Sequence, residues 1–114
     1  MRACVALRAA LPQQLGNQLQ RRIEPPSELT AAWGDPAIVL RCDVPTPAAY
    51  TPTAQLVTVN GIRWFSEQLS NGYAFTTVGR VANVEVTIPR RYAPEVNPLV
   101  DLAEPIERTL IRVE

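Results

Sequence analysis

Two tight turns in the second half of the chain constrain its fold more than any other feature. Asn60-Gly61 separates two stretches in which apolar and polar residues alternate, and this dipeptide is a strong signal for a two-residue β-hairpin turn. Ser70-Asn71-Gly72 has similar turn chemistry further along the chain. The strand-like runs around these turns are 55–60, 62–69, 73–78 and 80–88. The pattern predicts a meander of antiparallel strands.

A further strand is predicted at 37–44, ahead of this meander. The turn residues Trp33-Gly34-Asp35-Pro36 lead into it, and three prolines keep the following segment, 45–54, irregular. One face of the strand carries aliphatic side chains together with Cys42, whereas the other face carries Val39, Arg41 and Asp43. The aliphatic face is expected to lie on the core.

Helical patterns occur near both ends of the chain. The N-terminal apolar residues recur every three or four positions, with Pro12 interrupting the pattern. These residues are Cys4, Leu7, Leu11 and Leu15. Near the C-terminus, Asp101 followed by Glu104 predicts a helix with Asp101 as its N-cap. Residues 18–24 fit either a strand or more helix.

The predicted fold is therefore α+β. We expect an antiparallel sheet of about four to five strands, flanked on one face by an N-terminal and a C-terminal helix. A chain of 114 residues is long enough for one domain with one core, so residues 1–114 are taken as a single domain.

The chain has two cysteines, Cys4 on the apolar face of the first predicted helix and Cys42 on the apolar face of the predicted strand. A helix packed over a sheet brings two such inward positions together, which makes the pair a candidate disulfide closing a loop of about 38 residues. The alternative is two buried thiols that act as small apolar side chains. No C-x-x-C spacing occurs, which argues against a thiol redox enzyme.

Composition and motifs argue against several kinds of chemistry. The chain has no His, which removes the commonest general base and the commonest metal ligand. Because the net charge is zero, no nucleic-acid partner is expected. No Gly-rich phosphate loop or dinucleotide-binding fingerprint occurs, so neither a catalytic metal nor an organic cofactor is expected.

The candidate binding residues are Arg63, Phe65, Glu85 and Trp33. Adjacent residues of a strand point to opposite faces of a sheet, so Trp64 in the core would leave Phe65 on a polar face beside Arg63 and near Glu85. An aromatic ring on such a face is a candidate binding anchor. The alternative is that the Pro-rich segment 45–54 folds over Phe65.

Two other features also have alternative interpretations. Trp33 is either a platform on which a ligand stacks or a plug that closes one end of the core. Glu67 and Glu85 both lie on strands of the meander, and two acids in one cleft would suit carboxylate catalysis of the glycosidase kind. Otherwise they are solvated cross-strand neighbours of arginines.

Three blocks of the sequence resemble a family of proteins of unknown function, DUF3515. They are TAAWGDPAIVLRCDVP, QLVTVNGIRWF and GYAFTTVGRVANVEVTIP, and the resemblance extends from Cys4 to about Leu110. Members of this actinobacterial family resemble secreted or membrane-anchored proteins, usually with a hydrophobic segment ahead of this domain. The resemblance implies an extracytoplasmic, oxidising location and presentation by an N-terminal membrane anchor outside residues 1–114. It supplies no catalytic or binding residues.

Two classes of function follow from these observations. The first, which we favour, is a non-catalytic binding or scaffolding module of the cell envelope, whose partner is an envelope protein or a cell-wall component. The second is an enzyme of unusual type that acts on cell-wall material through carboxylates and arginines.

Overall fold

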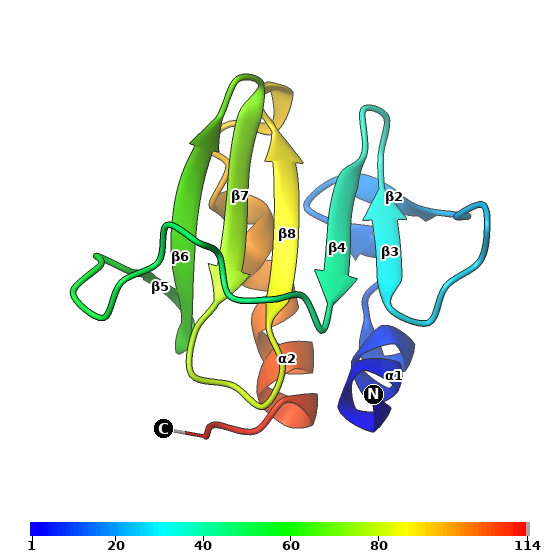
Figure 1. Ribbon diagram of the computed structural model, residues 1–114. Coiled ribbons are helices and arrows are strands. Elements are labelled where there is room, and N and C mark those ends of the chain that lie inside the picture. The colour runs from blue at the N-terminus through cyan, green and yellow to red at the C-terminus, as the bar shows by residue number, and fades with distance from the viewer. Residues whose placement is uncertain (114) are drawn as a thin grey trace.

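The computed structural model describes residues 1–113 and confirms an α+β fold built on an antiparallel sheet (Figure 1). The sheet has eight strands, more than the four to five predicted, in the order β1-β2-β3-β4-β8-β7-β6-β5. It consists of two consecutive meanders, β1–β4 and β5–β8, which are joined where their last strands, β4 and β8, pair antiparallel.

The second meander follows the sequence pattern closely. Its strands are β5 (Val57–Val59), β6 (Ile62–Leu69), β7 (Gly72–Thr77) and β8 (Val84–Pro89). Val59 pairs with Ile62 across the predicted turn, in which Asn60 and Gly61 have φ values of 50° and 88°. A type I′ turn requires positive φ at both central residues, and Asn and Gly adopt it readily. This is why Asn-Gly predicts a β-hairpin.

The sequence pattern predicts little of the first meander. Its strands are β1 (Gln14–Leu15), β2 (Gln18–Arg21), β3 (Thr30–Trp33) and β4 (Ile38–Cys42). Only β4 is predicted as a strand by its sequence pattern, and residues 18–24 fit either a strand or a helix. β1 has two residues and β3 contains two alanines, so neither has the run of β-branched or aromatic residues that marks a strand in sequence.

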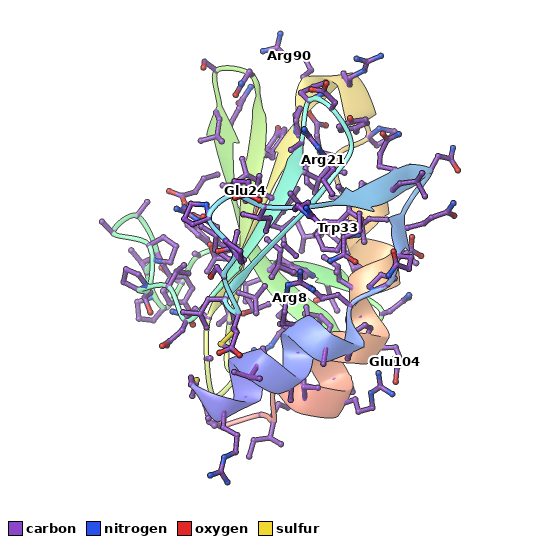
Figure 2. The ribbon with its side chains drawn as sticks, turned by 90° about the vertical axis from the view of Figure 1, so that its right-hand side faces the viewer. Arg8, Arg21, Glu24, Trp33, Arg90 and Glu104 are labelled. Atoms are coloured by element: carbon purple, nitrogen blue, oxygen red, sulfur yellow. A yellow bond between two sulfur atoms is a disulfide. The ribbon has the colours of Figure 1, made fainter. Side chains whose placement is uncertain are left out.

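Two short α-helices pack against each other, α1 (Arg2–Ala10) and α2 (Ala103–Thr109) (Figure 2). Two 3₁₀ helices precede α2, η1 (Arg90–Tyr92) and η2 (Asn97–Leu102). The N-terminal helix is shorter than its apolar pattern suggested, because Leu11 before Pro12 is already extended. Leu15, assigned by pattern to the helix face, lies in β1 and is nevertheless fully buried.

The predicted N-cap role of Asp101 is wrong. Asp101 lies inside η2, and α2 begins at Ala103 without a side-chain cap. Since η2 runs directly into α2, the first amides of α2 follow an existing helical turn and need no capping carboxylate. The Oδ2 atom of Asp101 instead accepts a hydrogen bond from the backbone N–H of Gly16, at 2.8 Å, which ties the β1–β2 turn to η2.

Both meanders and both α-helices contribute to one core. Trp33, Trp64 and Phe75 are its largest fully buried side chains. The predicted disulfide is confirmed: Cys4 of α1 is bonded to Cys42 of β4, with their Cα atoms 5.8 Å apart. The bridge therefore fastens the N-terminal helix to the strand at which the two meanders meet.

The Pro-rich segment between β4 and β5 crosses the front of β8, β7 and β6, on the side of the sheet away from α2 (Figure 1). It is fastened near its start, where the backbone N–H of Asp43 donates to the carbonyl of Asn83 at 2.8 Å. The side chain of Asn83 donates in turn to the carbonyl of Val44 and to Oγ1 of Thr46, at 3.0 and 3.2 Å. This crossing determines which part of the outer sheet face is covered.

Candidate functional site

A row of side chains runs across the outer face of the sheet, opposite the core. Cross-strand pairing places Phe65 of β6 beside Thr76 of β7, Thr76 beside Glu85 of β8, and Glu85 beside Arg41 of β4. The row therefore brings together two of the four residues predicted for a binding face, Phe65 and Glu85. Thr76 and Arg41 complete it.

Phe65 does not present an exposed ring. Its exposed fraction is 9%, and the ring of Tyr50 meets it edge-on with ring centres 5.5 Å apart. The Pro-rich segment folds over Phe65, which is the alternative that the sequence left open. This packing removes the apolar Phe65 ring from water. An exposed aromatic anchor at Phe65 is therefore wrong.

Trp33 does not belong to this face. It lies on the core side of β3, is fully buried, and donates a hydrogen bond from Nε1 to the carbonyl of Pro12 at 3.0 Å. A ring with no exposed surface cannot stack on a ligand, so the ligand-platform interpretation is wrong and the core-plug interpretation is confirmed. Within the strand, Trp33 and Ala31 share the buried positions of an alternating pattern.

Arg63 precedes Phe65 by two residues on β6, so the two share the outer face as predicted, but they line different hollows. Arg63 pairs with Thr58 of β5 and lines an open hollow with Thr58, Gly61 and Arg112 at the β5 edge of the sheet. The structure therefore divides the predicted face into two regions, one beneath the Pro-rich segment and one at the sheet edge.

The two acids considered for carboxylate chemistry do not converge. Glu85 forms an ion pair with Arg41. Glu67 lies opposite Ala74, which pairs with Thr87 and not with Glu85. With strands about 4.8 Å apart and about 3.3 Å per residue, this register separates the Cα atoms of Glu67 and Glu85 by roughly 12 Å. They are spaced surface carboxylates, one of them paired with Arg.

A small pocket lies between the outer face and the Pro-rich segment. Its volume is about 150 Å³, and Tyr50, Phe65, Thr76 and Asn83 are among its lining residues. Thr76 is 1% exposed, and its Oγ1 has no hydrogen-bond partner among residues 1–113. Buried hydroxyl groups almost always have partners, so the Thr76 hydroxyl is an exception within this sheet, although its oxygen atom is closed to the pocket.

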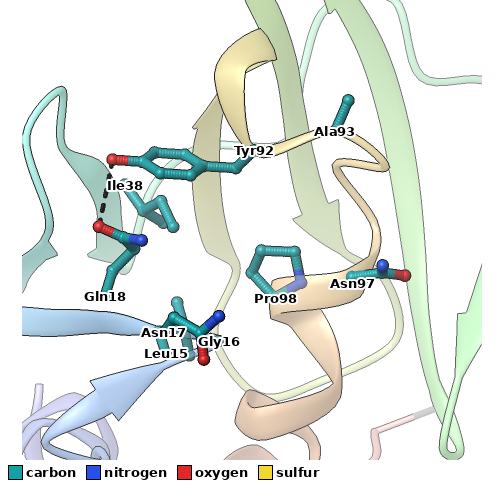
Figure 3. A pocket seen from close by; sticks show the side chains of 9 residues that line it. All are labelled: Leu15, Gly16, Asn17, Gln18, Ile38, Tyr92, Ala93, Asn97 and Pro98. Carbon is teal, nitrogen blue, oxygen red and sulfur yellow. Dashed lines mark hydrogen bonds between the residues drawn. The ribbon is translucent and has the colours of Figure 1, made fainter.

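A larger groove lies at the other meander, between the β1–β2 hairpin and the segment that leads into η2. Its volume is about 240 Å³. Figure 3 shows the amide side chains of Asn17, Gln18 and Asn97 around it, together with the ring of Tyr92. Its lining contains no charged side chain, so it offers hydrogen bonds and an aromatic surface without a net charge.

Tyr92 fixes one wall of this amide groove. Its hydroxyl donates to the carbonyl of Pro36 at 2.6 Å and lies 3.5 Å from Oε1 of Gln18 (Figure 3). Gly34 permits this close approach: at φ +78°, a Cβ there would lie 2.7 Å from Gln18 Oε1 and 2.8 Å from the Tyr92 hydroxyl. The WGDP turn therefore supports the groove through its glycine and proline while its Trp serves the core.

The groove and pocket residues Gln18, Tyr92, Thr76 and Asn83 were not singled out from the sequence. Each is an ordinary polar or aromatic residue with no motif around it. Their grouping depends on strand register and on the path of the Pro-rich segment, neither of which leaves a local signal.

Two further searches bear on the kind of site. Among residues 1–113, no three His, Cys, Asp or Glu side chains gather as metal ligands. No helix within the same residues combines the length and the apolar character needed to cross a membrane.

Comparison with protein families decides the relationship. A family model described as a protein of unknown function, DUF3515, matches residues 1–114. The chain belongs to the DUF3515 family. Neither the curated proteins nor the solved structures contain a significant match to this DUF3515 member.

Proposed function

We propose that this DUF3515 protein is a non-catalytic binding or scaffolding module of an actinobacterial cell envelope, held outside the plasma membrane by an anchor that precedes residue 1. The observation that carries the proposal is the amide groove. Three amide side chains and an aromatic ring surround it without a charged group. Such a lining suits recognition of a neutral, hydrogen-bonding ligand, which matches the polar but uncharged parts of cell-wall polymers.

The disulfide supports the proposed location. Disulfides persist in oxidising compartments and are rare in the reducing cytosol, and Cys4–Cys42 joins two core elements of this chain. A module outside the plasma membrane would retain this bond.

The alternative of an enzyme acting through carboxylates and arginines has less support. Hydrolysis with two acids requires carboxyl groups about 5 to 9.5 Å apart on either side of the scissile bond. Glu85 is engaged by Arg41, and Glu67 lies on a different row of the sheet. The lining of the amide groove contains neither a carboxylate nor an arginine.

Sedimentation with purified, protein-free cell-wall material tests the proposal. We expect the oxidised protein to co-sediment, with little loss when salt is raised, because screening has little effect on uncharged contacts. Gln18→Ala combined with Asn97→Ala should weaken sedimentation at least fivefold. Gln68→Ala, which removes an exposed amide outside the groove, is the matched control and should have no effect.

Three outcomes would contradict the proposal. If the wild-type protein stays in solution, it does not bind cell-wall material. If the Gln18/Asn97 variant sediments as well as the wild type, binding does not use the amide groove. Release of soluble sugar or peptide fragments during the incubation would support the enzymatic alternative instead.

A further inference from the structure

The outer face of the sheet carries a second row of side chains, two residues along each strand from the row that contains Phe65. Cross-strand pairing aligns Arg21 of β2, Ala32 of β3, Val39 of β4, Thr87 of β8, Ala74 of β7 and Glu67 of β6. The Pro-rich segment crosses nearer the start of β8, and Val39 and Thr87 are partly exposed (Figure 1). The second row is therefore open at its centre.

The centre of the second row differs from an ordinary solvated sheet face. An antiparallel sheet with one face in water normally carries polar side chains at its outward positions. Here the side chains of Ala32, Val39 and Ala74 are apolar, and that of Thr87 is small and uncharged. Side chains this short leave a surface on which another sheet can pack closely.

The two ends of the second row carry opposite charges. Five strand spacings separate Arg21 from Glu67, roughly 24 Å, so the two cannot pair within one chain. Arg21 donates from Nη1 to the carbonyl of Gly34 at 3.1 Å, and its guanidinium retains further N–H donors. The Glu67 carboxylate has no ion-pair partner among residues 1–113. Each end can therefore pair with an opposite charge from another molecule.

We propose that a second copy of this chain packs on the second row, with Arg21 of each copy paired with Glu67 of the other. The two copies are related by a two-fold axis that runs parallel to the strands, between β4 and β8. Such an axis reverses the strand order of the facing sheet, which places the Arg21 end of one row over the Glu67 end of the other. Packed sheets lie about 10 Å apart, a distance that extended Arg and Glu side chains bridge together. One self-complementary surface thus forms two ion pairs.

The same axis suits molecules that are anchored side by side. The N-terminal helix α1 lies at the end of the strands where β4 finishes, because Cys4 is bonded to Cys42 (Figure 1). A two-fold axis parallel to the strands places both α1 helices at the same end of the dimer, so both chains can extend to one membrane. This point rests on the proposed anchor before residue 1, whereas the charge pairing does not.

The dimer is expected to be weak in solution. A contact of roughly 24 Å by 15 Å per partner is well below the ~800 Å² that each side of a standard complex buries. We therefore expect a dissociation constant of about 0.1–1 mM. Anchoring in one membrane would raise the effective concentration of the chains and favour the dimer.

Sedimentation equilibrium of the oxidised full chain, from about 20 μM to about 1 mM, tests the proposal. The average mass should rise from monomer toward dimer over this range, and should rise less in high salt, because screening weakens the ion pairs. In ¹⁵N NMR spectra over the same range, amides of the second row should shift with concentration, whereas amides of α2 should not. No cell-wall material is present, so a failure here is distinguishable from a failure of the cell-wall binding experiment.

Charge reversal tests which residues pair. Arg21→Glu and Glu67→Arg should each weaken dimerisation by about tenfold or more, because each change places like charges together at both ends of the contact. An equimolar mixture of the two variants should restore dimerisation, since a mixed dimer regains two pairs of opposite charge. Arg108→Glu and Glu104→Arg, which reverse exposed charges on α2, are the matched controls and should dimerise as the wild type does.

The proposal is overturned if the chain remains monomeric at the highest concentration, as expected for a face that stays in water or binds a different partner. It is also overturned if Arg21→Glu dimerises as well as the wild type, or if the mixture of the two variants stays monomeric. Concentration-dependent shifts confined to other surfaces would assign the dimer to a different contact and would contradict the proposal as well.

Discussion

The two meanders of the sheet reach similar architectures by different means. In β5–β8, the strands are joined by short connections, and the Asn60-Gly61 turn adopts the backbone geometry that its sequence favours. In β1–β4, the strands are shorter, and contacts with distant parts of the chain hold them in place. The Trp33 indole bonds Pro12, Cys42 is linked to Cys4, and Gly16 bonds Asp101. Local patterning dominates the second meander, and long-range contacts dominate the first.

This difference predicts that mutations at long-range contacts will affect the first meander more than the second. A hairpin with a favourable turn has part of its order encoded locally, whereas strands of two to five residues need tertiary packing to persist. Three experiments test the comparison, from the largest expected effect to the smallest.

Truncation of either buried Trp should cause the largest loss of folding stability. Trp33→Ala and Trp64→Ala should each lower the free energy of unfolding by about 3–5 kcal/mol, measured by chemical denaturation, because both side chains are fully buried. Substitution by Phe sharpens the comparison. Trp33→Phe also loses the bond from Nε1 to Pro12, whereas Trp64 Nε1 has no partner among residues 1–113.

We therefore expect Trp33→Phe to be more destabilising than Trp64→Phe, by about 1 kcal/mol. Equal losses for the two Phe variants would show that the Pro12 contact does not stabilise the first meander.

Removal of the disulfide should have the next largest effect. The bridge closes a loop with a sequence separation of 38. The loop-entropy relation assigns it roughly 4 kcal/mol, less any strain. Cys4→Ala with Cys42→Ala should therefore lower the melting temperature by more than about 10 °C. In hydrogen exchange, amides of β3 and β4 should lose more protection than amides of β6 and β7.

Reductant is the control for this experiment. It should lower the stability of the wild type and leave the double variant unchanged. Uniform loss of protection across all strands would contradict the proposed difference between the meanders.

The smallest effect is expected at the link between the β1–β2 turn and η2. Asp101→Ala removes the acceptor for the Gly16 N–H. Because this hydrogen bond is exposed to water, the free energy of unfolding should fall by only about 0.5 kcal/mol. Faster exchange of the Gly16 amide is the more sensitive measurement. Glu104→Ala is the control, since Glu104 makes only an exposed ion pair with Arg108. Exchange at Gly16 that is equal in both variants would exclude a local role for Asp101.

Most residues of the candidate binding region could not be predicted from the sequence. Alternation correctly placed Phe65 and Glu85 on the outer face, but exposure of Phe65 depended on where 45–54 crosses the sheet. Three prolines in that segment predicted irregular backbone but no direction. Thr76 became notable only once a buried, unpartnered hydroxyl was seen beside a pocket.

The sequence by itself determined the α+β class, the meander around Asn60-Gly61, and the inward positions of Cys4 and Cys42. Each rests on a local rule: residue alternation, turn residues that adopt positive φ, or helical spacing. Only the tertiary structure decided the three additional strands of the first meander, the bond of Asp101 to Gly16, and the cover over Phe65. Those features depend on contacts between residues far apart in the chain, for which periodicity carries no information, because burial and pairing are settled only when the whole core packs.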